Sequence, residues 1–424
     1  MMELNYGHGT VSFSIKDERI NKVLKADERE GLKDPHAAAA EVVKNPTAGP
    51  PLLDLLNEKQ PEDIVIIVND VTRPTPYSVM LPPILDTIEK AGIAKGNVTF
   101  VVATGVHDRH TDQQNIEIFG EEVHNNYKFI HHDCDGEMVD MGDLSSGNNF
   151  KVNKKVYAAD FVITTGVILP HYFAGFSGGR KSILPGVAGR ETIENNHSWM
   201  VKLMGNLPPQ KENPVSLEMI EAAEKVGVDF IINVVTNSSR EIVKITAGDL
   251  KEAWYQGIDV SAEMYHVELE EKADVAVVSS GGFPRDINVY QSQKALDHAD
   301  HGTKKGGTII WAAECSEGLG EKTFETWMKE AEKPEDNEKR IKDKFVIGGH
   351  KAFAVSKVVK DKEVILISDL SKEKTENMFI KKMPDLQAAV DYVEDKYNGD
   401  YSCIILPQGS LTVPKVKADQ ETLS

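Results

Sequence analysis

The sequence has few cysteines and lacks a long apolar run. Its three cysteines, Cys134, Cys315 and Cys403, lie far apart among 424 residues. This usage excludes a disulfide framework and favours reduced thiols in a cytoplasmic protein. No apolar run approaches the roughly 20 residues that a transmembrane helix needs. Segment 1–10 has neither the basic nor the apolar region of a secretory signal. We therefore expect a cytoplasmic protein without a membrane partner.

Basic residues are also in short supply. The chain carries 67 acidic residues against 48 Lys and Arg, a formal charge of −19. This balance argues against nucleic acid or an anionic membrane surface as a partner. A small anionic substrate is not excluded, because local charge in a cleft decides its binding. The oligomeric state is left open.

The sequence also lacks the ligand spacing of a structural zinc site. The run 131–135 holds two histidines and Cys134 but has no second cysteine pair. We interpret this run as a polar strand end. Four histidines receive no catalytic role on sequence grounds: His110, His124, His131 and His132.

What the chain does contain is an alternation of apolar, β-rich runs and helical segments, which is typical of parallel α/β sheets. The predicted strands span 63–68, 98–103, 161–165, 230–235, 275–279, 308–312, 363–367 and 402–406. The predicted helices span 80–91, 216–226, 250–270, 288–301, 322–332 and 386–397. We expect two α/β domains with mainly parallel sheets, 1–270 and 271–424, and an active site in the cleft between them. The sheet to which the last strand belongs is left open.

Polar segments rich in glycine or proline follow four of these strands. They begin at Asp70, Ala103, Pro170 and Ser279. Ligands of open α/β sheets bind beyond the carboxyl ends of the strands. The four segments therefore predict one convergent binding site.

One segment, 175–182, nearly matches a phosphate-binding P-loop. It follows a predicted strand and ends in Lys181-Ser182. However, Arg180 stands where the P-loop requires glycine, and Pro185 interrupts the helix that should follow. A phosphotransferase that binds a nucleotide through 175–182 is therefore the alternative function.

The same segments resemble the nickel-pincer-nucleotide lactate racemase family, over roughly residues 1 to 415. The matching residues are Asp70-x-Thr72-Arg73-Pro74, Ala103-Thr104-Gly105-x-His107, Pro170-His171-x-Phe173-Ala174-Gly175-x-Ser177-Gly178-Gly179-x-Lys181, then Pro185, Gly186, Gly189, Thr192, Ile193 and His197, and Gly281-Gly282-x-Pro284-x-Asp286-Ile287-Asn288-x-Tyr290-Gln291-Ser292-x-Lys294. The resemblance implies a racemase or epimerase that acts on lactate or a related 2-hydroxy acid by reversible hydride transfer.

The resemblance also implies a cofactor and its maturation proteins. The cofactor is pyridinium-3,5-bisthiocarboxylic acid mononucleotide, which would be linked to Lys181 through a thioamide and would hold nickel. His197 would be the protein ligand of the nickel. Thr72, Ser177, Gly178 and Tyr290 would lie beside the phosphate and ring of the cofactor.

The remaining implied roles concern the substrate. His107 and His171 would be the acid/base pair. The substrate-binding residues would be Arg73, Gln291, Lys294 and Asp70.

These residue types suit the chemistry. Deprotonation at Cα is difficult beside a carboxylate, whereas removal of hydride gives a planar 2-keto acid that can be reduced on either face. No side chain accepts hydride, so a cofactor is required. Two histidines can serve one enantiomer each, and arginine binds a carboxylate through two parallel hydrogen bonds.

Val71, Arg180 and Arg285 depart from the family pattern and leave the substrate open. An extra guanidinium can contact a second carboxylate or a polyhydroxy chain of the substrate. It can equally face solvent or pair with an acid. A ligand-binding protein without catalysis is the third possibility, but it gives the separated histidines no role.

Overall fold

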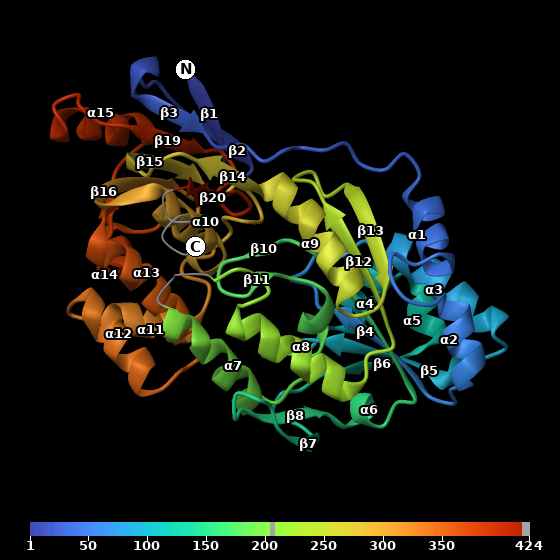
Figure 1. Ribbon diagram of the computed structural model, residues 1–424. Coiled ribbons are helices and arrows are strands. Elements are labelled where there is room, and N and C mark those ends of the chain that lie inside the picture. Colours follow the sequence, from blue (N-terminus) through green and yellow to red (C-terminus); the bar gives the residue numbers. More distant parts are fainter. Residues whose placement is uncertain (204–207, 418–424) are drawn as a thin grey trace. The chain divides into compact units, whose positions relative to one another are not determined.

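The computed structural model describes residues 1–203 and 208–417 (Figure 1). The chain divides into two compact units. One, here called the middle unit, is Glu28–Ala262, and the other, the terminal unit, combines Met1–Asp27 with Glu263–Ser424. The expected division at residue 270 differs from this one, because residues 1–27 belong with the later part of the chain.

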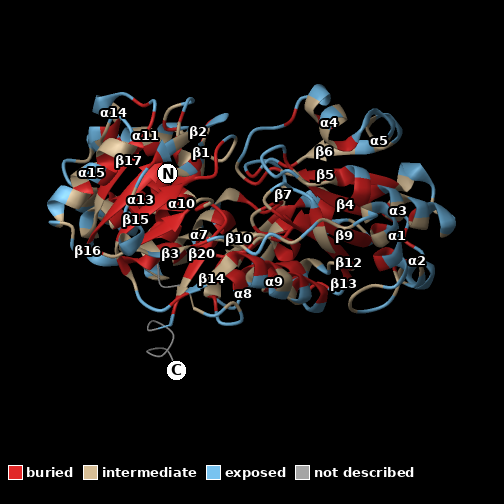
Figure 2. Cartoon of the chain, turned by 90° about the horizontal axis from the view of Figure 1, so that it is seen from above, coloured by how far each residue is buried: buried red, intermediate tan, exposed pale blue. Residues whose placement is uncertain are grey.

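The middle unit is built on a six-stranded sheet with the order β13-β12-β9-β4-β5-β6. All neighbours are parallel except β12 and β13. Its strands are β4 (Ile64–Asn69), β5 (Val98–Ala103), β6 (Lys128–His131), β9 (Phe161–Val167), β12 (Phe230–Thr236) and β13 (Ile242–Gly248). Every residue of β9 and β12 is buried, as expected for strands covered on both faces (Figure 2).

Helices cover this sheet, and short hairpins extend from it. The helices are α1 (Pro35–Lys44), α2 (Leu52–Lys59), α3 (Tyr77–Lys90), α4 (Asp112–Phe119), α5 (Glu121–Asn126), α6 (Lys154–Tyr157), α7 (Arg190–Leu203), α8 (Pro214–Val226) and α9 (Glu252–Tyr265). The short elements are β7 (Met138–Asp143), β8 (Asn149–Asn153), β10 (Pro170–His171), β11 (Gly175–Phe176) and the 3₁₀ turn η3 (Gly179–Ser182). One face of β4 packs against α1, α2 and α3 in a common core. The glycine-rich segment packs through η3 against β4, β9 and β12.

The terminal unit contains a second six-stranded sheet, entirely parallel, with the order β18-β17-β16-β15-β19-β3. Its strands are β3 (Ile20–Val23), β15 (Ala273–Ser279), β16 (Thr303–Ala312), β17 (Glu363–Ile367), β18 (Lys381–Lys382) and β19 (Cys403–Leu406). The other strands are β1 (Met2–Tyr6), β2 (Gly9–Phe13), β14 (His266–Leu269) and β20 (Val413–Val416). The helices are α10 (Val289–Gly302), α11 (Lys322–Glu330), α12 (Pro334–Asp343), α13 (Gly349–Asp361), α14 (Lys372–Asn377) and α15 (Leu386–Lys396).

The α/β fold with mainly parallel sheets is confirmed, and every predicted strand overlaps an observed one. The last predicted strand, β19, lies between β15 and β3 in the terminal unit. The predicted helix 250–270 is too long. It ends at Tyr265, and His266–Leu269 is a strand that pairs with β20.

The strand order positions the candidate site. β9, β4 and β5 are parallel neighbours, so their carboxyl ends lie at one edge of the middle-unit sheet. The segments that begin at Asp70, Thr104 and Pro170 start from this edge. Within the described residues, none of the helices combines the length and apolar character that a membrane crossing requires.

Candidate active site

The turn after β4 and the turn after β5 meet in a carboxylate–imidazole pair. Oδ2 of Asp70 lies 2.5 Å from Nδ1 of His107. Oδ1 of Asp70 accepts hydrogen bonds from the hydroxyl of Thr72 at 2.6 Å and from its N–H at 3.0 Å. The ionised Asp70 carboxylate accepts a hydrogen bond from Nδ1–H of His107, which leaves Nε2 as the nitrogen that can take a proton from a ligand.

The charges around Asp70 keep it ionised. Burial, the largest effect, acts to raise the pKa of its carboxyl. The hydrogen bond and charge of His107, the charge of Arg73 and the hydroxyl of Thr72 outweigh burial, so the pKa is lowered. Arg73 and Thr72 themselves are exposed. The turn thus combines a fixed carboxylate with an accessible guanidinium.

His110 fixes this turn, a role that the sequence did not reveal. The N–H of Val71 donates to Nε2 of His110 at 2.8 Å, and Nδ1 of His110 lies 3.0 Å from Oδ1 of Asn115. The ring is therefore a neutral tautomer that accepts at one nitrogen and donates at the other. No local pattern indicates this contact, because His110 lies 39 positions from Val71.

The buried ring of Phe173 brings three of the predicted site residues together. Its centroid lies 4.6 Å from that of His171 and 5.0 Å from that of His197, both rings in edge contact. Nζ of Lys181 lies 5.7 Å from the same centroid. Sequence reasoning treated Phe173 only as part of a motif. The structure makes it the common neighbour of Lys181 and two histidines.

His197, on α7, has the properties of a metal ligand. Burial, followed by the charge of Lys181, lowers the pKa of His197 to about 3, against a weaker opposing effect of the Ile193 carbonyl. Nδ1 of His197 is buried and makes no hydrogen bond of normal geometry within the described part of the chain. A neutral imidazole is the form that binds metals. No group of three or more His, Cys, Asp or Glu side chains suited to a metal occurs among the described residues, so a metal here would need ligands from a cofactor.

Hydrogen bonds to neighbouring strands fix the glycine-rich turn 175–182. The Ser177 hydroxyl donates to the carbonyl of Val167 at 2.6 Å and accepts from the N–H of Leu169 at 2.9 Å. The N–H of Gly179 donates to Oδ1 of Asn233 at 2.9 Å. Gly178 has a φ of +79°, and a Cβ there would lie 2.7 Å from Cγ1 of Ile168. These groups shape the turn, and the N–H groups of Ser177 and Gly179 donate within the fold rather than toward a ligand.

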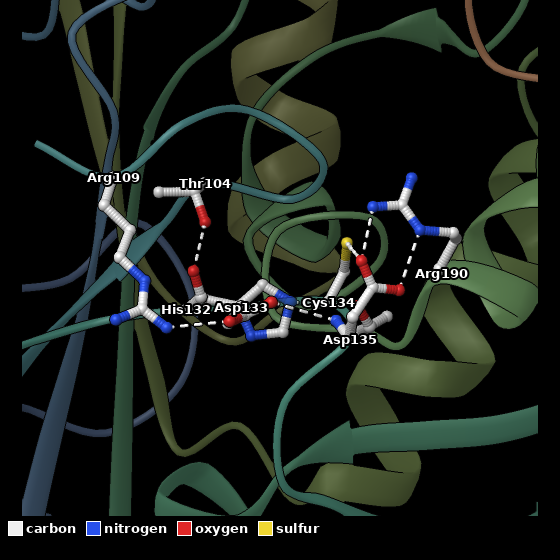
Figure 3. Close-up of polar contacts among 8 residues, drawn as sticks. Thr104, Arg109, His132, Asp133, Cys134, Asp135 and Arg190 are labelled. Carbon is white, nitrogen blue, oxygen red and sulfur yellow. Dashed lines mark hydrogen bonds and ion pairs between the residues drawn. The ribbon is translucent and has the colours of Figure 1, made fainter.

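The polar run after β6 connects two parts of the site (Figure 3). The Thr104 hydroxyl, in the turn that carries His107, donates to the carbonyl of His132 at 2.7 Å. Nε2 of His132 lies 2.9 Å from the carbonyl oxygen of Ala188, two residues before α7. Arg190, the first residue of α7, binds both carboxylate oxygens of Asp135 at 2.8 and 2.6 Å. Turn 132–135 therefore links the His107 turn to the helix that carries His197.

The remaining predicted residues lie in the terminal unit, on the first turns of α10. The side chain of Asn288 accepts from the N–H of Gln291 at 3.0 Å and caps this helix. Gln291 and Lys294 are three positions apart and so share a helix face. A buried lysine that sequence reasoning missed, Lys351, has Nζ 5.0 Å from the ring centroid of Tyr290.

Comparison with known proteins gives a consistent result along the chain. The model of the lactate racemase N-terminal domain matches residues 6–206, and that of the lactate racemase C-terminal domain matches residues 269–413. The lactate racemase of Thermoanaerobacterium thermosaccharolyticum is 34% identical, and the alignment covers 98% of this chain and 99% of the relative. The lactate racemase of Lactiplantibacillus plantarum is 30% identical, with 96% and 98% covered.

Solved structures agree. The lactate racemase apoprotein from Thermoanaerobacterium thermosaccharolyticum superposes with a TM-score of 0.91 at 34% identity, covering 98% of this chain and 99% of that chain. A protein from Thermotoga maritima has a TM-score of 0.66 at 18% identity, covering 92% and 100%. The second likeness concerns the fold alone.

Proposed function

This chain belongs to the lactate racemase family, and we propose that it is an isomerase that racemises or epimerises lactate or a related 2-hydroxy acid. One observation carries the proposal beyond family membership. His171, Lys181 and His197 surround the ring of Phe173, in the unit that also holds the Asp70–His107 pair. A general base, an amine and a neutral imidazole are the protein groups that this reaction requires.

We propose that Lys181 carries the pyridinium bisthiocarboxylate mononucleotide and that His197 ligates its nickel. The neutral, buried imidazole of His197 fits a metal that takes its other ligands from a cofactor. When bound, the cofactor would supply the electrophilic carbon that accepts hydride from the substrate and returns it. Maturation proteins would be required to install it.

His107 and His171 are proposed to move the hydroxyl proton. Asp70 holds His107 with Nε2 available as the acceptor. Nδ1 of His171 lies 3.4 Å from the backbone nitrogen of Ala174, so Nε2 is the nitrogen that we propose exchanges a proton with the substrate. One histidine, as a neutral imidazole, would take the hydroxyl proton, and the other, as an imidazolium, would give a proton to the keto oxygen. The roles reverse for the opposite enantiomer.

Arg73, Gln291 and Lys294 are proposed to bind the carboxylate and hydroxyl of the substrate, and Tyr290 and Thr72 to lie beside the cofactor. The contacts favour different roles for two further residues. Both oxygens of Asp70 are engaged, which supports orientation of His107 rather than substrate binding. The Ser177 hydroxyl is engaged within its turn, so we propose that Ser177 and Gly178 shape the turn beside the cofactor.

The P-loop alternative lacks its main requirement. Backbone N–H groups must point at a phosphate, but those of Ser177 and Gly179 donate to the Leu169 carbonyl and to Asn233. After η3 no helix begins before Arg190. The substrate-binding geometry of a phosphotransferase is therefore not supported.

The test is an assay of wild-type protein produced together with the maturation proteins. Each pure enantiomer of lactate and of larger or more acidic 2-hydroxy acids is incubated, and the product is resolved by chiral chromatography. We expect equal end points from both enantiomers of one acid, without added nucleotide. Activity that depends on added nucleotide and magnesium, with no isomerisation, would establish the phosphotransferase instead.

A further inference from the structure

Arg180 directly precedes the proposed attachment lysine and is completely enclosed. Its side chain is 1% exposed. No carboxylate of the described residues forms an ion pair with it, and burial lowers its pKa well below the usual value. The guanidinium therefore neither faces solvent nor pairs with an acid, and it is not accessible to a substrate. A buried cation of this kind is costly unless its hydrogen bonds are satisfied.

The hydrogen bonds of Arg180 are satisfied by the loop that it ends. Nη1 donates to the carbonyl of Phe176 at 2.9 Å and to that of Gly178 at 3.3 Å. Nη2 donates to the carbonyl of Ala174 at 3.1 Å. The loop 174–178 thus turns alternate carbonyls toward one guanidinium.

Two helices complete the surroundings of the guanidinium. Loop 174–178, Ser216 and Trp254 together are here called the Arg180 cage. The hydroxyl of Ser216, on α8, accepts from Nη2 at 3.0 Å and from Nε at 3.3 Å. The central carbon of the guanidinium lies 3.7 Å from the ring centroid of Trp254, on α9. Trp254 also donates through Nε1 to the carbonyl of Ser177 at 2.9 Å. Every N–H of the guanidinium has an acceptor, and its face is stacked on an aromatic ring.

The loop held in this way lies between two proposed functional residues. His171 precedes it and Lys181 follows it, and both contact Phe173. We propose that Arg180 is a positioning residue that fixes the backbone of 174–181 and thereby sets Lys181 and His171 in place before the cofactor is attached. The inference rests on the proposed function for what these two residues do, but the geometry of the cage is independent of it.

The proposal predicts that charge alone cannot replace Arg180. Lysine keeps a cation but loses the planar fork that reaches three carbonyls and a hydroxyl together. Arg180→Lys and Arg180→Met should therefore behave alike. The matched control is Arg340→Lys, the same chemical change at a partly exposed arginine on α12 that pairs with Glu330, outside the cage and outside the candidate site.

The first measurement uses the apoprotein. Competitive labelling of amines with a small acylating reagent, read by peptide mass spectrometry between pH 7 and 10, gives the reactivity of Lys181 relative to the exposed Lys154. In Arg180→Lys and Arg180→Met, Lys181 should label about threefold faster or more than in the wild type, because the lysine is no longer held. In Arg340→Lys, Lys181 should label as it does in the wild type.

The second measurement is the fraction of each protein that acquires the adduct on Lys181 when produced with the maturation proteins. We expect the fraction with adduct to fall about fivefold or more in both Arg180 variants and to stay unchanged in Arg340→Lys. Wild-type labelling and wild-type occupancy in Arg180→Lys would overturn the proposal. If wild-type protein itself acquires no adduct, the proposed function fails, while the labelling still decides the role of Arg180.

A further variant, Ser216→Ala, allows the proposal to be tested even if the Arg180 variants do not fold. It removes one acceptor of the guanidinium and keeps the arginine. We expect labelling of Lys181 about twofold faster than in the wild type. If the Arg180 variants do not fold, this variant alone decides, and an unchanged labelling rate in it would overturn the proposal.

Discussion

At the scale of single residues, side chains far apart in sequence act in pairs. His107 lies 37 positions from Asp70, yet the two form one short hydrogen bond. The sequence allowed both to be predicted at the same sheet edge, because each follows a parallel strand. It did not predict the bond, since which atoms meet depends on the turn geometry. For the same reason, the sequence alone does not distinguish an Asp70 that orients His107 from an Asp70 that binds the substrate.

Asp70→Asn tests the proposed orientation of His107. The amide keeps the size of the side chain but lacks the charge that holds the Nδ1 proton. We expect kcat for isomerisation to fall on the order of a hundredfold, the usual contribution of one acid/base group, with the adduct and nickel content unchanged. The measurement is steady-state kinetics on protein of known nickel content.

Asp108→Asn is the matched control, because Asp108 is an exposed neighbour of His107. It should keep wild-type kinetics. An Asp70→Asn variant within twofold of the wild-type kcat would show that His107 does not depend on this carboxylate.

At the scale of secondary-structure elements, the prediction from sequence was wrong where two strands distant in sequence pair with each other. Segment 266–269 continues an acidic, helix-forming sequence, but it becomes strand β14 because β20 lies parallel to it. No local pattern carries that information. By contrast, the apolar runs of β9 and β12 are buried on both faces, so their sequence alone indicated strands.

The link made by turn 132–135 depends on a neutral histidine. Burial, the largest effect, lowers the pKa of His132 from 6.5 to about 4. Its Nε2 lies 2.9 Å from the carbonyl oxygen of Ala188, and its Nδ1 lies 3.3 Å from Nδ2 of Asn153. In the neutral form with a proton on Nε2 only, Nε2 donates to the Ala188 carbonyl and Nδ1 accepts from the Asn153 amide. A second proton on the ring would face the Asn153 amide.

This pKa predicts a loss of stability in acid. The unfolded chain takes up a proton near pH 6.5, whereas folded His132 does so only near pH 4. The neutral His132 therefore contributes stability that is complete above pH 6.5 and is lost as the pH falls from 6.5 to 4. The total loss in the free energy of unfolding is roughly 3 kcal/mol. The free energy of unfolding, measured with urea, should fall between pH 7 and pH 5 for both proteins. The fall should be about 2 kcal/mol smaller for His132→Asn than for the wild type.

The exposed His36 provides the control for this experiment. His36→Asn should show the same pH dependence as the wild type. If His132→Asn and the wild type lose equal stability between pH 7 and 5, the acid sensitivity comes from other groups, such as the buried His298, whose pKa burial also lowers to about 4.

At the scale of the whole molecule, the sequence predicted two parallel α/β sheets and the strand ends that carry polar turns. It did not predict that residues 1–27 join the terminal unit, because β3 pairs with β19 almost four hundred positions away. The Phe173 cluster and the Arg180 cage also depend on packing between distant elements. The family resemblance implied roles for Lys181 and His197 without showing that both lie beside the ring of Phe173.

The proposed function requires Lys181 to carry a nickel cofactor that His197 ligates. The most direct test is intact mass together with nickel content for wild type, Lys181→Arg and His197→Ala, each produced beside the maturation proteins, with Lys154→Arg as control. We predict an adduct of several hundred daltons with nickel in the wild type and control. Lys181→Arg should have neither, and His197→Ala should keep the organic adduct at least partly but lose nickel. Retention of nickel or of activity by Lys181→Arg, or a wild-type protein of unmodified mass that is nevertheless active, would contradict the account.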